Sequence, residues 1–240
     1  MAKHTKTVIG LLAVLLVIFF FDTGLTSESR AQTPGLKFLV TWQAKSYVPP
    51  QYSGKILPTM GSRITVVFDV VSGGKIVDLS GQPISWYLGE QTLGSGRGMQ
   101  SITFLAPDGS AGYIDLRIEL QQDDQSKLRI SQLLIKTLQI PIVNPEAVIE
   151  APYPGGIFGG YSPQVSGMPY FFSVSSPSAL NYTWSVNGEN PQNAENPSLL
   201  TVDLNQDAPL GSTISIGLTI QDPRNATAAA QAYTGLTLGK

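Results

Sequence analysis

The chain has 240 residues, of which 42% are hydrophobic and 13% are charged, and its formal net charge at pH 7 is −2. This small negative charge gives no reason to expect a nucleic acid as a partner. The chain contains no cysteine, and its only histidine is His4. Beyond the first few residues the composition therefore excludes disulfides, thiolate metal sites, cysteine nucleophiles, histidine zinc sites and a Ser-His-Asp triad.

The first 31 residues have the features of an export signal. Two lysines precede an apolar run from Val8 to Phe21, whose 14 residues are fewer than the ~20 that a membrane-spanning helix needs. A small-x-small pattern would allow cleavage after Ala31, although the polar stretch before it is long for a cleavage region. Residues 1–31 are therefore predicted to be a signal peptide or an uncleaved N-terminal membrane anchor with a transmembrane helix; a buried core helix is a weaker third alternative.

The position of the lysines predicts where the rest of the chain resides. Because they precede the apolar run, they keep the N-terminus in the cytoplasm, so everything after the run is exported. We expect a secreted or periplasmic protein if cleavage follows Ala31, and otherwise a membrane-anchored protein with its domains outside the cytoplasm.

After residue 31 the apolar pattern has a period of two and not of 3.6. The clearest segment, residues 114–121, alternates Ile, Leu, Ile and Leu with Asp, Arg, Glu and Gln. Similar alternation occurs in residues 38–44, 64–70 and 214–221, and Gly- and Pro-containing turn signals separate these segments. The pattern is typical of half-buried antiparallel strands and predicts an all-β sandwich or barrel.

The predicted strands recur with an offset close to 100 residues. The strand around Trp86 aligns with the strand around Trp184 at an offset of 98, and residues 114–121 match residues 214–221 at an offset of 100. A period of this length indicates two copies of one domain and not a solenoid of small repeats. Both tryptophans are predicted to lie in the cores.

Each copy resembles the immunoglobulin-like (Ig-like) sandwich, in which a tryptophan of the third strand fills the core between two sheets. The run from Trp184 to Gly188, Trp-x-x-Asn-Gly, also resembles Ig-like modules of bacterial surface proteins. Unlike antibody domains, the chain has no disulfide pair. The resemblance implies two tandem Ig-like β-sandwiches, at residues 34–142 and 143–240, after an N-terminal hydrophobic helix. It also implies a binding, spacing or adhesive role in a cell envelope.

A weak calcium site is predicted at Asp203, Asn205 and Asp207, where oxygen side chains alternate along the chain. An EF-hand loop would have glycine at Ala208 and would close with a glutamate, and this segment has neither. The simpler alternative is a strand end whose polar side chains face water. No other metal site and no cofactor is predicted.

A glycine-rich stretch with three aromatic residues is the strongest candidate for a partner-binding surface. Its aromatic residues are Tyr153, Phe158 and Tyr161, and Tyr47 and Tyr52 of the first half are predicted to join the same surface. If exposed, such a patch has the composition of an interaction site. The alternative is a structural loop whose aromatic side chains fold back over the end of the second sandwich.

The sequence predicts a protein that is not an enzyme. Its glutamates show no spacing that would pair them, so catalysis by two carboxylates, as in a glycosidase, is only a third alternative. The expected function is that of an exported, non-catalytic envelope or cell-surface protein that acts as a structural, scaffold or adhesion-type protein-binding module. The main alternative is a carbohydrate-binding module for a wall or surface polysaccharide. Charge divides unevenly, with +2 over residues 32–145 and −5 over residues 146–240.

Overall fold

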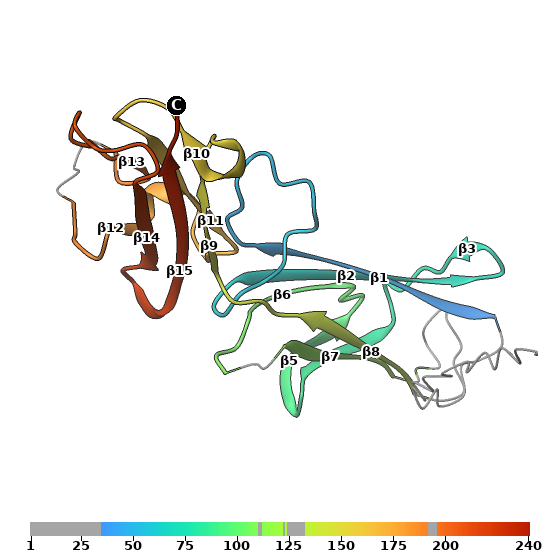
Figure 1. Ribbon diagram of the computed structural model, residues 1–240. Helices are drawn as coiled ribbons and strands as arrows, with labels where there is room; N and C mark the ends of the chain where they lie inside the picture. The colour runs from blue at the N-terminus through green and yellow to red at the C-terminus, as the bar shows by residue number, and fades with distance from the viewer. Residues whose placement is uncertain (1–34, 110–111, 122, 124–132, 192–195) are drawn as a thin grey trace, which may run out of the picture. The chain divides into compact units, whose positions relative to one another are not determined.

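The structure is a computed structural model that describes residues 35–109, 112–121, 123, 133–191 and 196–240 (Figure 1). The predicted signal peptide or anchor, with its hydrophobic helix, lies outside these residues. The described part is almost entirely β-structure, with two short 3-10 turns, η1 (Pro154–Gly156) and η2 (Pro177–Ala179). It contains no helix that is long and apolar enough to cross a membrane.

The first half forms two antiparallel sheets. In one sheet, β2 lies between β1 and β6, and the short β3 pairs with the end of β2. The other sheet has the order β5-β4-β7-β8. The strands are β1 (Leu36–Lys45), β2 (Arg63–Ser72), β3 (Lys75–Ile76), β4 (Pro83–Leu88), β5 (Gln91–Arg97), β6 (Ser101–Leu105), β7 (Tyr113–Leu120) and β8 (Leu134–Pro141).

The second half also forms two sheets. One sheet has the order β13-β11-β9, and the other has the order β10-β15-β14-β12, in which β10 pairs with β15 in parallel. The strands are β9 (Glu146–Glu150), β10 (Ile157–Phe158), β11 (Gln164–Tyr170), β12 (Asn181–Val186), β13 (Leu199–Thr201), β14 (Thr213–Asp222) and β15 (Asn225–Leu238).

The strand order confirms the predicted fold class. In an Ig-like sandwich, strands A, B and E share one sheet and strands C, F and G share the other. The sheets β1-β2-β6 and β4-β7-β8 follow this division in the first half, as β9-β11-β13 and β12-β14-β15 do in the second. Each half is therefore an Ig-like β-sandwich.

Each sandwich encloses its own hydrophobic core, with one tryptophan at its centre. Trp86 is completely buried, and its ring meets the ring of Phe68 from the opposite sheet at 5.4 Å between centroids. Trp184 is 6% exposed. The domain boundaries at residues 142 and 143 stay a prediction, since Tyr47 of the first half packs against the second core.

The predicted duplication extends to a hydrogen bond inside each core. The indole Nε1 of Trp86 donates to the carbonyl oxygen of Met99 at 2.8 Å, and that of Trp184 donates to the carbonyl oxygen of Pro197 at 2.9 Å. Both donors and both acceptors are separated by 98 residues, the offset that the sequence showed. A buried indole N–H needs a hydrogen-bond acceptor, and both halves supply it from a backbone carbonyl at the matching position.

A buried carboxylate closes the turn between β14 and β15. Asp222 is 4% exposed, and its Oδ1 accepts hydrogen bonds from the backbone N and from Nε of Arg224, both at 3.0 Å. Nη2 of Arg224 donates to Oδ2 at 2.9 Å. These hydrogen bonds hold the pKa of Asp222 below its usual value of 3.8, and those from the Arg224 side chain contribute most. Burial of the carboxylate acts in the opposite direction.

We expect that replacing Asp222 with asparagine lowers the thermal midpoint at pH 7 and that the difference from the wild type shrinks in acid. Because the folded-state pKa is lowered, the ionised carboxylate stabilises the fold above the unfolded pKa of about 4, and this contribution is lost as the pH falls through the folded pKa. Circular dichroism melts between pH 7 and pH 2 measure the effect. Asp108→Asn, in an exposed turn, is the matched control. A midpoint that the Asp222 substitution leaves unchanged at pH 7 would contradict the assignment.

Candidate functional site

The glycine-rich stretch does not expose its aromatic residues as a group. Phe158 is 1% exposed and belongs to the second core, because β10 pairs with the end of β15 and turns this side chain inward. The ring of Tyr153 packs 5.9 Å from that of Phe158, and its hydroxyl accepts a hydrogen bond from the backbone N of Gln164 at 2.7 Å. Only Tyr161 is exposed, at 40%. The predicted exposed surface of three aromatic residues is therefore wrong, because Phe158 is a core residue and the hydroxyl of Tyr153 is hydrogen-bonded to the start of β11.

Tyr47 and Tyr52 contact the second half of the same chain. The backbone N of Tyr47 donates to the carbonyl oxygen of Phe172, and the backbone N of Phe171 donates to that of Tyr47, both at 2.7 Å. The ring of Tyr52 meets the rings of Tyr170 and Phe171 edge-on, with centroids 6.1 and 5.6 Å apart. Both tyrosines are therefore engaged in an internal contact.

The two aromatic groups lie at opposite ends of β11, so they do not form one surface as predicted. Tyr153 is bonded to Gln164 at the start of β11, whereas Tyr52 packs against Tyr170 at its end. At ~3.3 Å per residue, these two ends of the strand are about 20 Å apart. The sequence could not show this, because the separation is set by strand direction and not by composition.

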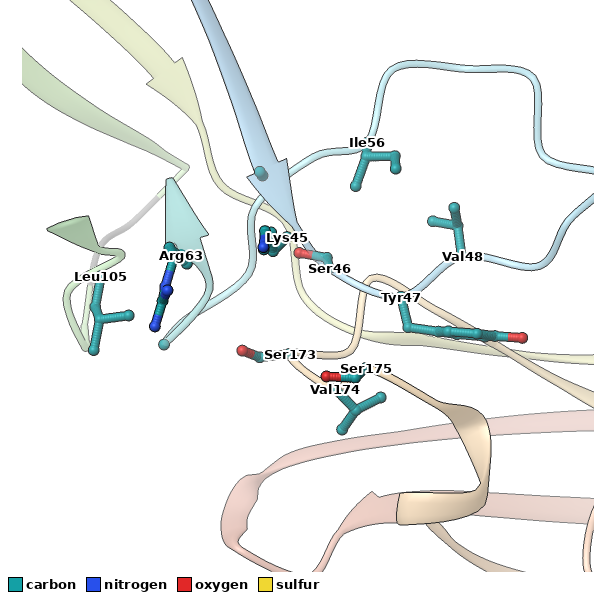
Figure 2. Close-up of a pocket in the computed structure, with 12 residues that line it drawn as sticks. Lys45, Ser46, Tyr47, Val48, Ile56, Arg63, Leu105, Ser173, Val174 and Ser175 are labelled. Carbon is teal, nitrogen blue, oxygen red and sulfur yellow. The ribbon is translucent and has the colours of Figure 1, made fainter. Parts of the chain in front are cut away.

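A pocket of about 700 Å³ lies beside the contact made by Tyr47. Figure 2 shows Lys45 and Arg63 on one side of it and Ser173, Val174 and Ser175 on the other. The twelve residues that line it include these two cations and no carboxylate, so the pocket favours anions over cations.

The phenol of Tyr182 also has a shifted pKa. Burial, with a smaller contribution from neighbouring Tyr47, raises its pKa to about 12. Tyr182 therefore stays neutral at physiological pH, and Asp222 stays ionised. Neither shift produces an acid or base that titrates near neutrality.

Two side-chain oxygen atoms of the weak calcium candidate accept hydrogen bonds, one from a distant residue and one within a local turn. Oδ1 of Asp203 accepts from the hydroxyl of Ser162 at 2.9 Å, and Oδ1 of Asn205 accepts from the backbone N of Asp207 at 3.1 Å. The second contact is an Asx turn, the arrangement expected at a polar strand end. In the part of the chain that the structure describes, no three His, Cys, Asp or Glu side chains are grouped so that they could hold a metal ion. The calcium site stays a prediction, and the Asx turn accounts for Asn205 and Asp207 without it.

Strand β1 is the open edge of its sheet. It pairs with β2 along all ten of its residues, and no other described strand pairs with it. The seven residues from Phe38 to Ala44 carry no charge, with one lysine on either side of them. Leu39 is 53% exposed on the outer face, and Phe38, Val40 and Trp42 are only partly buried against the core. An edge of this kind presents unpaired backbone groups that another strand can extend.

An exposed tyrosine that the sequence analysis did not single out lies on the second sandwich. Tyr233 of β15 is 73% exposed and stands opposite Gly217 of β14, which in turn stands opposite Ser185 of β12. The sequence does mark this strand as unusual, because no charged residue occurs between Arg224 and Lys240. The alternation of β15 is weak, however, because its inward positions are mostly alanine and threonine.

No protein-family model and no curated protein matches the chain. Among solved structures, it is similar to three N-terminal domains of the Highly Immunogenic Outer Capsid protein (Hoc) of bacteriophage RB49, with 12% identity over 84% of this chain and 59% of that one and a TM-score of 0.42. It is also similar to a D1–D4 ectodomain fragment of ICAM-5, with 13% identity, 84% and 53% coverage and a TM-score of 0.30.

A third similar structure is SGBP-B of a Bacteroides ovatus mixed-linkage glucan utilization locus, in complex with a heptasaccharide. The identity is 10%, the coverage is 83% of this chain and 47% of that one, and the TM-score is 0.25. This chain spans 47–59% of the three chains it resembles. Its own strand order defines it as a protein of two Ig-like β-sandwiches.

Proposed function

We propose that the protein is an exported, non-catalytic module of the cell envelope or cell surface that holds a partner protein through the open edge of β1. The apolar run from Val8 to Phe21 supports export. The observation that carries the binding function is the edge itself, with ten residues of strand that have a neighbour on one side only among the described residues.

The composition of β1 supports strand addition as the mode of binding. Native proteins protect their edge strands with charged residues, prolines or bulges, and the segment from Phe38 to Ala44 contains no charge and no proline. Its pairing with β2 is regular over its full length. A partner strand would gain backbone hydrogen bonds for affinity and contacts with alternate side chains for specificity.

The two lysines that bound the uncharged segment indicate what the partner strand is like. Lys37 and Lys45 both lie on the outer face of the sheet, and Lys45 stands opposite Arg63 of β2. Like charges that face each other across strands are unfavourable, and an acidic side chain on an added strand would relieve this. The proposed partner is therefore an extended, largely apolar segment with acidic residues at its ends.

A lysine placed on the edge should abolish partner binding without harming the fold. Leu39→Lys puts a charge on an exposed side chain opposite Asp69, so the thermal midpoint should stay within about 2 °C, while recovery of the partner should fall at least ten-fold. Co-purification with a tagged copy expressed in the native host measures the loss.

Val67→Lys is the matched control. Val67 is 41% exposed on the same face but lies on the central strand β2, so its backbone is already paired on both sides. The proposal expects normal recovery with this variant. Equal losses of partner recovery with both variants would mean that the partner binds the outer face of the sheet and not the edge of β1, which would overturn the proposal. Normal recovery with Leu39→Lys would overturn it as well.

A further inference from the structure

On the outer face formed by β12, β14 and β15, the ring of Tyr233 lies over Gly217. A Cβ atom added at Gly217 would come within 2.5 Å of Oγ of Ser185 and 3.0 Å of Cε1 of Tyr233. The ring of Tyr233 therefore covers Gly217 closely, and 73% of the side chain remains exposed. The hydroxyl of Tyr233 donates to Oε1 of Gln231 at 3.3 Å, which helps to hold the ring in place.

This face carries no charged side chain. The register of the three strands places thirteen residues on it, every one neutral and most with a hydroxyl or an amide. They are Asn181, Thr183, Ser185, Thr213, Ser215, Gly217, Thr219, Gln221, Ala229, Gln231, Tyr233, Gly235 and Thr237. A solvent-facing sheet of this size ordinarily includes charged residues, so the fold alone does not account for their absence.

The first half of the chain shows that the scaffold does not require a neutral face. At the offset of 100 residues, Ser215, Gly217 and Thr219 correspond to Asp115, Arg117 and Glu119 of β7. There, Nε of Arg117 lies 3.1 Å from Oε1 of Glu119, and the guanidinium stacks over the ring of Tyr87 at 4.5 Å. The same position in the two copies is thus an arginine between two carboxylates in one and a glycine under an exposed tyrosine in the other.

We propose that the outer face of β12-β14-β15 binds a neutral glycan chain, with one sugar ring stacked on Tyr233. The apolar C–H face of a sugar ring packs against an aromatic ring, and its hydroxyls need neutral donors and acceptors. Thr183, Thr219 and Gln231 form the row beside Tyr233 and supply them. This inference goes beyond the proposed function, because it concerns a different sandwich and a different class of ligand.

The charge of the second half excludes an acidic glycan as the favoured ligand. Residues 146–240 carry a net charge of −5, and the proposed face offers no cation to an anionic polymer. Protein interfaces are enriched in arginine and apolar side chains, whereas this face has a single aromatic residue among small polar ones. The side chains therefore suit a neutral sugar better than either alternative.

Affinity electrophoresis of the exported part of the full chain tests the site. The gels contain one neutral polysaccharide each, namely β-glucan, α-glucan, mannan, xylan and galactan, with polygalacturonate as the acidic comparison. We expect at least one neutral polymer to retard the protein and Tyr233→Ala to weaken that binding at least ten-fold. Tyr113→Ala, which removes a 52% exposed tyrosine from the other sandwich, should bind normally.

Two further variants separate stacking from folding. Tyr233→Phe keeps the ring and should retain binding, whereas Gly217→Val displaces the ring without removing it and should bind as weakly as Tyr233→Ala. Thermal midpoints recorded for each variant show whether it is folded. The proposal is overturned if no neutral polymer retards the wild type, if only polygalacturonate does, or if Tyr233→Ala binds as well as the wild type. None of these results bears on partner capture at β1, so the two proposals fail separately.

Discussion

Replacing Trp86 with alanine lowers the free energy of unfolding by about 3–5 kcal/mol. The side chain is completely buried, and it contacts Phe68 across the two sheets, so its removal leaves a cavity that the surrounding side chains fill only in part. The carbonyl oxygen of Met99 also loses its indole donor. Urea denaturation followed by far-ultraviolet circular dichroism measures the loss.

Trp86→Phe separates the cavity from the hydrogen bond. It retains an aromatic ring in the core but leaves the carbonyl of Met99 without its donor, so we expect a smaller loss, of about 1–3 kcal/mol. Trp184→Ala should resemble Trp86→Ala, since the second sandwich holds its tryptophan in the same way. A loss below about 1 kcal/mol for Trp86→Ala would contradict the packing described for the first core.

Replacing Phe158 with serine has an effect of similar size, about 3–5 kcal/mol, because the side chain is 1% exposed in the second core. The substitution also buries a hydroxyl among apolar side chains. Tyr161→Ser is the control, as Tyr161 is exposed on the same stretch and its loss should stay within about 0.5 kcal/mol. The same denaturation measurement applies to both variants.

This pair of variants discriminates between two accounts of the glycine-rich stretch. If the stretch were an exposed binding loop, Phe158→Ser would leave the thermal transition nearly unchanged and affect only partner capture. The structure predicts the reverse, a marked loss of stability. An unchanged transition for Phe158→Ser would restore the exposed-loop hypothesis.

The fold was largely predictable because its signal is local. Alternation in residues 114–121 and 214–221 reflects strands with one buried and one solvated face, and these segments are β7 and most of β14. The two tryptophans were correctly predicted to lie in the cores because each occupies the same position in its copy of the domain. The offset of 98 residues predicted the matching strands, and the structure adds that the indole hydrogen bonds of the two copies match at the same offset.

The candidate sites were less predictable because they depend on pairing between distant strands. Phe158 is buried by β10 pairing with Leu238, eighty residues along the chain. Tyr233 is a candidate binding residue because the strand register places it over Gly217, and the sequence does not show this register. The open edge of β1 follows from the order of strands in the sheet, which alternation does not reveal. Composition alone therefore grouped aromatic residues that the structure separates.

Site-directed photo-cross-linking in the native host tests the central claim most directly. A photoreactive amino acid replaces Leu39 on the edge strand or, as the control, Val67 on the central strand of the same face. After irradiation of intact cells, adducts are purified from solubilised envelope and identified by mass spectrometry. The mass of the recovered chain also shows whether residues 1–31 are retained.

The proposed function predicts one abundant envelope-protein adduct from position 39, mapped to an extended segment with acidic ends, and little or none from position 67. A position-39 adduct with a second copy of this chain would contradict the account by making β1 a self-association edge. The absence of any protein adduct from position 39 in the native envelope would contradict it as well.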